Sequence, residues 1–164
     1  IMVELKTGLA SAYKELRELI SAFRLKIDER GFQTALIETT EEFSRRCHLQ
    51  IDCRNDLPPT LLSANEEIHV LRIIREALAN IEKHAQASAV AISASISEHQ
   101  VVTIQVSDNG VGIGDTKSPE NHYGLIIMED RAQSLHGSIT IRNGASGGTE
   151  VLLTFIPEKS GTDH

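Results

Sequence analysis

The sequence is poor in aromatic and sulfur-containing residues. Among its 164 residues there is no tryptophan, aromatic residues make up 4%, and there are two cysteines and two methionines. The core must therefore be built from leucine, isoleucine, valine and alanine. Cys47 and Cys53 stand six positions apart, which fits neither a CxxC redox pair nor a zinc knuckle. We expect two reduced cysteines packed near a strand.

Two further absences narrow the class of protein. The formal net charge is −7 and no basic stripe is visible, which excludes a general nucleic-acid binder. No apolar run approaches the roughly 20 residues that a membrane span needs, and no signal peptide is recognisable. The length of 164 residues suits one compact domain with a modest appendage, and a composition of 40% hydrophobic and 24% charged residues is ordinary for a globular protein.

The first 30 residues carry a helical pattern with a narrow apolar seam. Its apolar residues step by four and three along the chain: Leu9, Tyr13, Leu16, Ile20, Phe23 and Ile27. The seam predicts either a helix that packs against another helix or an ordinary amphipathic surface helix, and the pattern favours neither. Gly31 is expected to break the helix. Because the chain opens with Ile1-Met2-Val3 inside this pattern, we expect a piece of a longer protein.

The rest of the sequence mixes helical and strand-like segments. Helices are predicted at about 32–46, from the Ser63-Ala64-Asn65-Glu66 capping box to about 85, and at 125–135. Strands are predicted at 49–53, 89–96, 101–107, 139–141 and 151–156. This order predicts an α+β fold, a two-layer sandwich with helices on one face of a mixed sheet, preceded by the N-terminal helix. The polar stretch 115–121 has the composition of a mobile lid.

A polar face is predicted on the helix that follows the capping box. Glu76 and Asn80 are four residues apart, and Lys83 and His84 follow one turn later on the same side, opposite an apolar stripe. A carboxylate, an amide oxygen and a lysine aligned in this way could hold Mg²⁺ and phosphate oxygens. A solvated polar face without a ligand would give the same pattern.

A glycine-rich loop follows the strand that ends near Ser107. It reads Asp108-Asn109-Gly110-Val111-Gly112-Ile113-Gly114, and its alternate glycines let the backbone approach a flat ring or a phosphate. Asp108 can accept a hydrogen bond from an exocyclic amine, such as N6 of adenine. Asp-Asn-Gly is also a common turn, so a plain loop is the alternative.

Two later segments extend the pattern. Asn121-His122-Tyr123-Gly124-Leu125 is predicted to lead into a helix whose N-terminus offers free N–H groups to a phosphate, with Gly124 leaving room for it. His122 is either a contact of the lid or an idle surface histidine. Arg131 either reaches phosphates or pairs with a neighbouring carboxylate. Gly147-Gly148-Thr149 is either a plain hairpin turn or the source of a hydroxyl near the base.

In this order the four features resemble the N, G1, G2 and G3 boxes of the GHKL, or Bergerat, ATP-binding fold. That family includes histidine kinases, DNA gyrase B, Hsp90 and MutL. Within it, REALxNxxKHAxAS at 75–88 and HYGLxIMxDRAQSL at 122–135 look like the histidine kinases that phosphorylate LuxR-type response regulators. They are similar to the nitrate/nitrite sensor kinases of the NarX type. LRELISAFRLKID at 16–28 resembles the second helix of that family's dimerisation and phosphotransfer hairpin.

The resemblance implies a domain division and roles for single residues. Residues 1–30 would be part of the hairpin, 31–158 the ATP-binding catalytic domain and 159–164 a tail. Glu76 would be the catalytic acid near the reacting phosphate, and Asn80 the Mg²⁺ ligand. The residues implied to contact ATP are Asn80, Lys83, His84, Asp108, Gly110, Gly112, His122, Gly124, Leu125, Arg131 and Thr149.

The resemblance also implies a reaction, partners and a location. ATP and Mg²⁺ would be the cofactors, and the γ-phosphoryl group would pass to a histidine and then to an aspartate of a LuxR-type response regulator. The parent would be a homodimer whose kinase domain lies in the cytoplasm of a bacterium, below an inner-membrane sensor. This chain itself would contact the hairpin of the same protein or of its dimer mate, and neither membrane nor nucleic acid.

One departure from the family limits the expected activity. The family's phosphoacceptor histidine lies in an ELHD-like motif, and none of the seven histidines here has that context. We therefore expect the chain to bind ATP without phosphorylating itself. Two alternatives remain: an ATPase in which Glu76 activates water, and a binding module that has lost its affinity for ATP.

Overall fold

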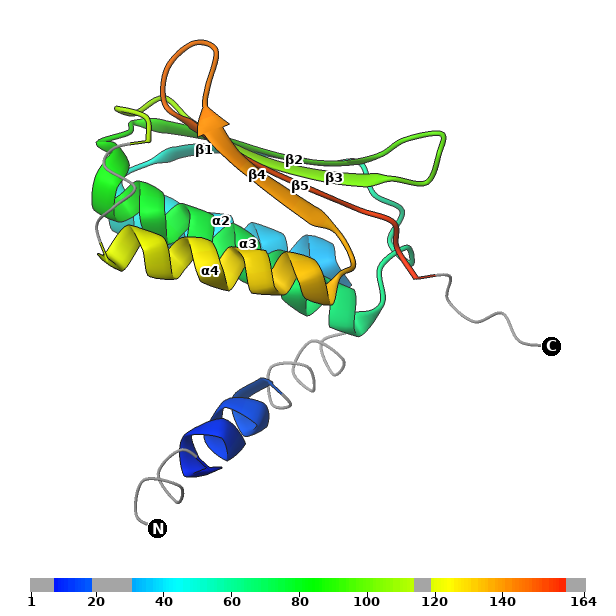
Figure 1. The fold of residues 1–164 in the computed structure, drawn as a ribbon. Coiled ribbons are helices and arrows are strands. Elements are labelled where there is room, and N and C mark those ends of the chain that lie inside the picture. The colour runs from blue at the N-terminus through cyan, green and yellow to red at the C-terminus, as the bar shows by residue number, and fades with distance from the viewer. Residues whose placement is uncertain (1–7, 19–30, 114–118, 159–164) are drawn as a thin grey trace, which may run out of the picture.

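The computed structural model describes residues 8–18, 31–113 and 119–158. Three helices cover one face of a five-stranded mixed sheet (Figure 1). The helices are α2 (Gly31–Cys47), α3 (Ala64–Asn80) and α4 (Pro119–Ser134), with a short π-helix, η1 (Ile81–Ala85), after α3. The strands are β1 (Gln50–Asn55), β2 (Ala89–Ile96), β3 (Val102–Asp108), β4 (Ser138–Asn143) and β5 (Thr149–Phe155). The predicted α+β sandwich is confirmed.

The strand order brings distant parts of the chain to one end of the sheet. The order is β1-β2-β3-β5-β4, with β1 parallel to β2 and every other pair antiparallel. Asp108 ends β3 opposite Val90, and Thr149 begins β5 opposite Asn143. Since Ser107 pairs with Glu150, the end of β3 and the start of β5 are neighbours. The glycine-rich loop after β3 and the Gly147-Gly148-Thr149 segment before β5 therefore meet at this end.

The core lies between the sheet and the helices. The strands alternate as predicted: Val102, Ile104 and Val106 of β3 are buried, while the residues between them are only partly covered. α3 runs between α2 and α4 (Figure 1) and contacts both. A helix flanked on two sides buries more than one stripe, so Val70 and Ile73 are buried in addition to the apolar stripe of Ile68, Leu71, Ile74 and Leu78.

The start of α3 is fixed by the predicted capping box. The Ser63 hydroxyl accepts a hydrogen bond from the N–H of Glu66 at 3.2 Å, and Glu66 Oε1 accepts one from the N–H of Ser63 at 3.0 Å. The second carboxylate oxygen of Glu66 accepts a hydrogen bond from the N–H of Glu158 at 3.0 Å. This buried carboxylate therefore ties the beginning of α3 to the segment that follows β5.

Two helix predictions need correction. The prediction of an ordinary helix up to about residue 85 is wrong for its last turn, since α3 passes into the π-helix η1 and ends where Gln86 adopts φ 49°. The predicted start of the last helix at Leu125 is also wrong, because α4 begins at Pro119. Proline is favoured in the first turn of a helix, since it supplies the right φ and its missing N–H is not needed there.

Other predictions fall partly outside the described residues. Residues 115–118 of the predicted lid (115–121) lie there, and so do Ile20, Phe23 and Ile27 of the seam and the expected helix end before Gly31. Residues 8–18 are helical, and the seam residues Leu9, Tyr13 and Leu16 are 68%, 64% and 54% exposed. Across the described ranges, no helix is both long and apolar enough to span a membrane.

Candidate functional site

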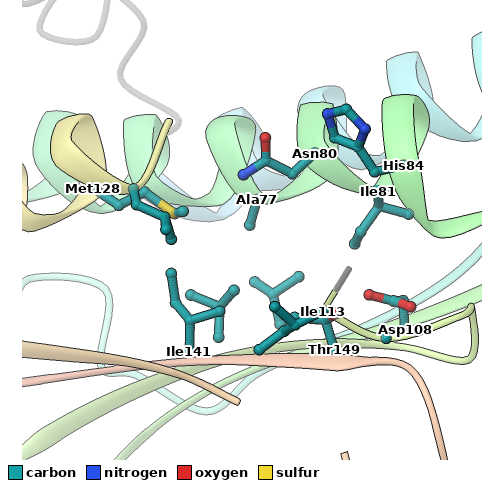
Figure 2. A pocket seen from close by; sticks show the side chains of 13 residues that line it. Ala77, Asn80, Ile81, His84, Asp108, Ile113, Met128, Ile141 and Thr149 are labelled. Carbon is teal, nitrogen blue, oxygen red and sulfur yellow. The ribbon is translucent and has the colours of Figure 1, made fainter. Parts of the chain in front are cut away.

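An apolar cavity opens between the helices and the end of the sheet where β3 finishes. Figure 2 shows side chains from α3, η1 and α4 on one side of it and from the strands and the loop after β3 on the other. It is lined by Ala77, Asn80, Ile81, His84, Val106, Asp108, Gly112, Ile113, Leu125, Met128, Ile141, Thr149 and Val151. The cavity measures about 90 Å³. Pockets that enclose a drug-sized ligand hold roughly 300–1,000 Å³, so this one would enclose a single flat group.

Asp108 is the buried acid of this cavity. It is 7% exposed, and its Oδ1 accepts a hydrogen bond from the N–H of Gly110 at 2.8 Å. Among the described residues its second carboxylate oxygen accepts no hydrogen bond, and Figure 2 shows the carboxylate at the edge of the cavity. A buried acceptor beside apolar walls is suited to a ligand that carries a ring and an N–H donor.

Asn109 fixes the backbone next to Asp108. Its Oδ1 accepts hydrogen bonds from the N–H groups of Ser88 and Ala89, both at 3.0 Å, and its Nδ2 donates to the Ser88 hydroxyl at 2.9 Å. Its own N–H donates to the carbonyl of Ala89 at 3.2 Å. These hydrogen bonds join the loop after β3 to the start of β2. They restrict the backbone next to Asp108 and so help to fix the position of its side chain.

A second polar group of residues lies where α4 crosses α3. A methyl group at Gly124 would lie 2.7 Å from Glu76 Oε1 and within 3.5 Å of both polar atoms of the Asn80 side chain. Glycine at this position therefore lets α4 lie close to α3 without displacing the ends of those side chains. Gly124 lies inside α4 rather than at its start, so its N–H is not one of the free groups of a helix N-terminus.

Most of the predicted site residues lie at the cavity or beside it. Asn80, His84, Asp108, Gly112, Leu125 and Thr149 line the cavity, and Gly110 supports Asp108. Glu76 and Gly124 form the adjoining polar corner, while Lys83 is exposed and does not line the cavity. The His122 side chain lies outside the described part of the structure.

Arg131 pairs with a residue distant in the sequence, not with a neighbouring carboxylate as one of its two predicted roles required. Its Nη2 donates to Glu18 Oε1 at 2.9 Å, which joins α4 to the helix formed by residues 8–18. This hydrogen bond, with the positive charge behind it, holds the pKa of the Glu18 carboxyl below its usual value. Arg131 is not among the residues that line the cavity.

Sequence reasoning missed most of the apolar wall. Ile81, Ile113 and Ile141 face the cavity from η1, the loop and β4, and Met128 faces it from α4 (Figure 2). Helical spacing could have found Ile81, which follows Ala77 by four residues on the face that also carries Asn80 and His84. That face is thus not opposite the apolar stripe, as predicted, but continuous with it. Ile113 and Ile141 had no such signal.

Comparison with known proteins agrees with this arrangement. Residues 65–160 match the family of histidine kinase-, DNA gyrase B- and HSP90-like ATPases. The nitrate/nitrite sensor protein NarX of Escherichia coli (strain K12) is 43% identical over 163 residues, which are 99% of this chain and 27% of that protein. The nitrate/nitrite sensor protein NarQ of the same organism is 41% identical, over 94% of this chain and 27% of its own length. The chain thus spans about a quarter of these relatives.

Solved structures share the fold at lower identity. The ATP binding domain of PrrB from Mycobacterium tuberculosis superimposes with a TM-score of 0.61 at 24% identity, covering 77% of this chain and 93% of that one. The blue-light activated histidine kinase of Erythrobacter litoralis EL346 gives a TM-score of 0.64 at 17% identity, over 76% and 44%. With the matched family model covering more than half of its residues, the chain belongs to the histidine kinase-, DNA gyrase B- and HSP90-like ATPase family.

Proposed function

We propose that this chain is the ATP-binding catalytic domain of a sensor histidine kinase, with residues 31–158 as the domain and 1–30 as part of a dimerisation and phosphotransfer hairpin. The observation that carries the proposal is the buried Asp108 carboxylate beside an apolar slot, next to the corner formed by Glu76, Asn80 and Gly124. The slot would take adenine, with Asp108 accepting from its exocyclic amine. The triphosphate would then extend towards the polar corner.

The polar corner suits Mg²⁺ held together with a triphosphate. Mg²⁺ prefers oxygen ligands and is usually bound by one or two side chains together with substrate phosphates. Glu76 and Asn80 offer a carboxylate and an amide oxygen side by side, both close to Gly124 of α4. Asn80 would be the metal ligand, and the bound ion would neutralise phosphate charge in the reaction.

The protein's own part in the reaction is positioning. Phosphoryl transfer asks for an aligned γ-phosphate and for charge neutralisation rather than for covalent chemistry by side chains. The apolar walls and Asp108 fix the base, and His84 lines the same cavity from η1. Glu76, on the outer side of α3, would face the incoming imidazole and receive or orient its proton. Lys83 and the α4 segment around Leu125 would lie beside the phosphates.

The relatives suggest the larger context. NarX and NarQ are named nitrate/nitrite sensors, so we propose a nitrate/nitrite-responsive parent, homodimeric and membrane-bound, whose kinase part is cytoplasmic. The phosphoryl group would pass from a histidine of the hairpin to an aspartate of a LuxR-type response regulator. A histidine in an ELHD-like context is absent from the sequence, so the acceptor would be supplied by another segment.

Calorimetry with a non-hydrolysable ATP analogue tests the proposal. We expect saturable binding of one analogue per chain, strengthened by Mg²⁺ and weakened by Asn80→Ala, which removes the metal ligand. Absence of binding with and without Mg²⁺ would overturn the proposal and leave a module without nucleotide affinity.

Incubation with labelled ATP and Mg²⁺ separates a kinase from an ATPase. We expect no stoichiometric acid-labile label on this chain, and hydrolysis no faster than that of a Glu76→Ala variant. Turnover well above that of Glu76→Ala would instead support an ATPase in which Glu76 activates water.

A further inference from the structure

Asn143 joins the glycine-rich loop to the β4–β5 turn. It is the last residue of β4, and its Oδ1 accepts a hydrogen bond from the backbone N–H of Ile113 at 2.8 Å, across 30 positions of sequence. Gly112 and Ile113 line the cavity, whereas Asn143 does not. A side chain outside the cavity therefore holds the backbone of a segment inside it.

The contact depends on close approach at Gly112. A methyl group there would lie 2.7 Å from Asn143 Oδ1 and 3.4 Å from the carbonyl oxygen of Gly148. Gly112 also has φ +85°, which disfavours other residues. The second glycine of the loop is thus what lets the Asn143 side chain reach Ile113.

The loop is held on two flanks by asparagine side chains. On the β2 side, Asn109 accepts hydrogen bonds from the N–H groups of Ser88 and Ala89. On the β4 side, Asn143 accepts the one from Ile113. Asn109 belongs to the recognisable Asp-Asn-Gly motif, but nothing in the sequence marks Asn143. Within the described residues, the Asn143 bond is the hydrogen bond that holds the Ile113 N–H.

We propose that Asn143 is a positioning residue for nucleotide binding. By holding the N–H of Ile113 it keeps the glycine-rich loop in the shape that leaves the slot open for a flat ring. A loop held in its binding conformation loses less conformational entropy when the ligand enters, so affinity rises without a new contact to the ligand. The inference rests on the proposed ATP site.

The test compares two substitutions of Asn143 with a matched asparagine elsewhere. Asn143→Ala removes the acceptor, whereas Asn143→Asp keeps an acceptor oxygen of the same reach. Asn55 is the control: it ends β1, its Oδ1 accepts the N–H of Leu57 at 3.1 Å, and it lies towards the opposite end of the sheet. The measurements are analogue affinity with Mg²⁺ by calorimetry, thermal unfolding, and exchange of the Ile113 amide.

We expect Asn143→Ala to weaken analogue binding by about threefold to tenfold, the range that the loss of one hydrogen bond gives. The Ile113 amide should exchange faster in that variant. Asn143→Asp should bind the analogue within about twofold of the original protein. Asn55→Ala should lose about as much Tm as Asn143→Ala does and yet bind the analogue with unchanged affinity.

Three results would overturn the inference while leaving the ATP site intact. These are unchanged affinity in Asn143→Ala, an equal loss in Asn143→Asp, and an equal loss in Asn55→Ala. Failure of the unsubstituted protein to bind the analogue would instead overturn the proposed function and this inference together.

Discussion

Asp108 divides its two carboxylate oxygens between the protein and the cavity. One accepts the N–H of Gly110 at 2.8 Å, which leaves the other for a ligand. In Asp108→Asn the amide oxygen would keep the bond to Gly110, so the amide N–H₂ would face the cavity as a donor. In the proposed site, this amide donor and the N6 donor of adenine would then face each other. We expect analogue affinity to fall about tenfold or more, because a buried donor left unpaired costs about 1–3 kcal/mol.

Calorimetry with the ATP analogue measures this loss, and Asp52→Asn is the control. Asp52 is an exposed aspartate of β1 and does not line the cavity. Its amide variant should bind as the original protein does. Undiminished binding by Asp108→Asn would mean that the carboxylate does not read the base.

Substitution of Gly124 should affect nucleotide binding without lowering the stability of the protein. Alanine is the better helix former by about 1 kcal/mol, so Gly124→Ala should keep or raise the Tm. Its methyl would lie 2.7 Å from Glu76 Oε1, and the flexible end of that side chain would turn away. We expect Mg²⁺-dependent analogue binding to fall about tenfold while the protein stays folded.

Thermal unfolding and calorimetry of the same Gly124→Ala sample test this, with Gly8→Ala as control. A methyl at Gly8 would meet no atom within 4 Å. Gly8→Ala should therefore leave binding unchanged. Retained Mg²⁺ dependence in Gly124→Ala would argue against a metal or phosphate at the Glu76 corner.

At the scale of the elements, the β4–β5 turn contains two neighbouring glycines, Gly147 and Gly148. Both have positive φ, but their surroundings differ. Gly147 has φ +99° and open space around it, whereas Gly148 has φ +75° and a methyl there would lie only 1.7 Å from the carbonyl oxygen of Asp108. Gly147→Ala should cost the strain alone, about 1–3 kcal/mol, and keep binding. Gly148→Ala should cost clearly more and lose binding, because the turn must leave Asp108.

Urea unfolding and analogue binding of the two alanine variants measure that difference. The Gly147 variant is the internal control for positive-φ strain. Equal stability and equal binding in the two would show that the turn moves freely away from β3.

Local sequence signals predicted most elements but not where helices change character. Alternating apolar residues found the strands, and Ser63 with Glu66 found the start of α3, since both signals are contained in a few neighbouring residues. The π-helix η1 carries no such signal. It is accompanied by a tertiary contact, in which Arg46 of α2 pairs with Glu82 at 3.1 Å. The early start of α4 was missed because Pro119 and Asn121 also suit a loop.

The residues of the candidate site that could be predicted are those whose type is unusual at their position in the sequence. Gly112 and Gly124 stand out because a positive φ or a close approach favours glycine there, and Asp108 stands out because it ends a strand ahead of alternate glycines. Asn143 and Ile141 come into the site only because β4 pairs with β5 at the edge of the sheet, a pairing that no local pattern encodes. The apolar wall was likewise hidden, since any core residue has the same composition.

At the scale of the whole molecule, α4 connects the cavity to the N-terminal helix. Leu125 and Met128 line the cavity, and Arg131, one turn further along, pairs with Glu18. The side chains of this pair are 13% and 33% exposed, so the contact is partly shielded from solvent. The cavity and the N-terminal helix thus share one rigid element.

The same interface makes the molecule's stability sensitive to acid through His69 of α3. Its Nδ1 is buried and has no hydrogen-bond partner among the described residues. Burial lowers the pKa of His69 below its usual 6.5, and the positive charges of Arg131 and Arg72 lower this pKa further. The negative charge of Glu18 acts in the opposite direction without cancelling them. The unfolded chain therefore takes up this proton at a higher pH than the folded protein does.

The free energy of unfolding should consequently fall as the pH drops through about 6.5, and His69 should add no such slope well above that pH. His69→Phe removes both the titrating group and the unpaired nitrogen, so its Tm should fall less than that of the original protein between about pH 7.5 and pH 5.5. His99→Phe, at the exposed tip of the β2–β3 hairpin, is the control for exchanging a histidine for phenylalanine outside this interface. Thermal unfolding across this range measures all three proteins. Parallel curves for His69→Phe and the original protein would place the source of the acid sensitivity in other groups.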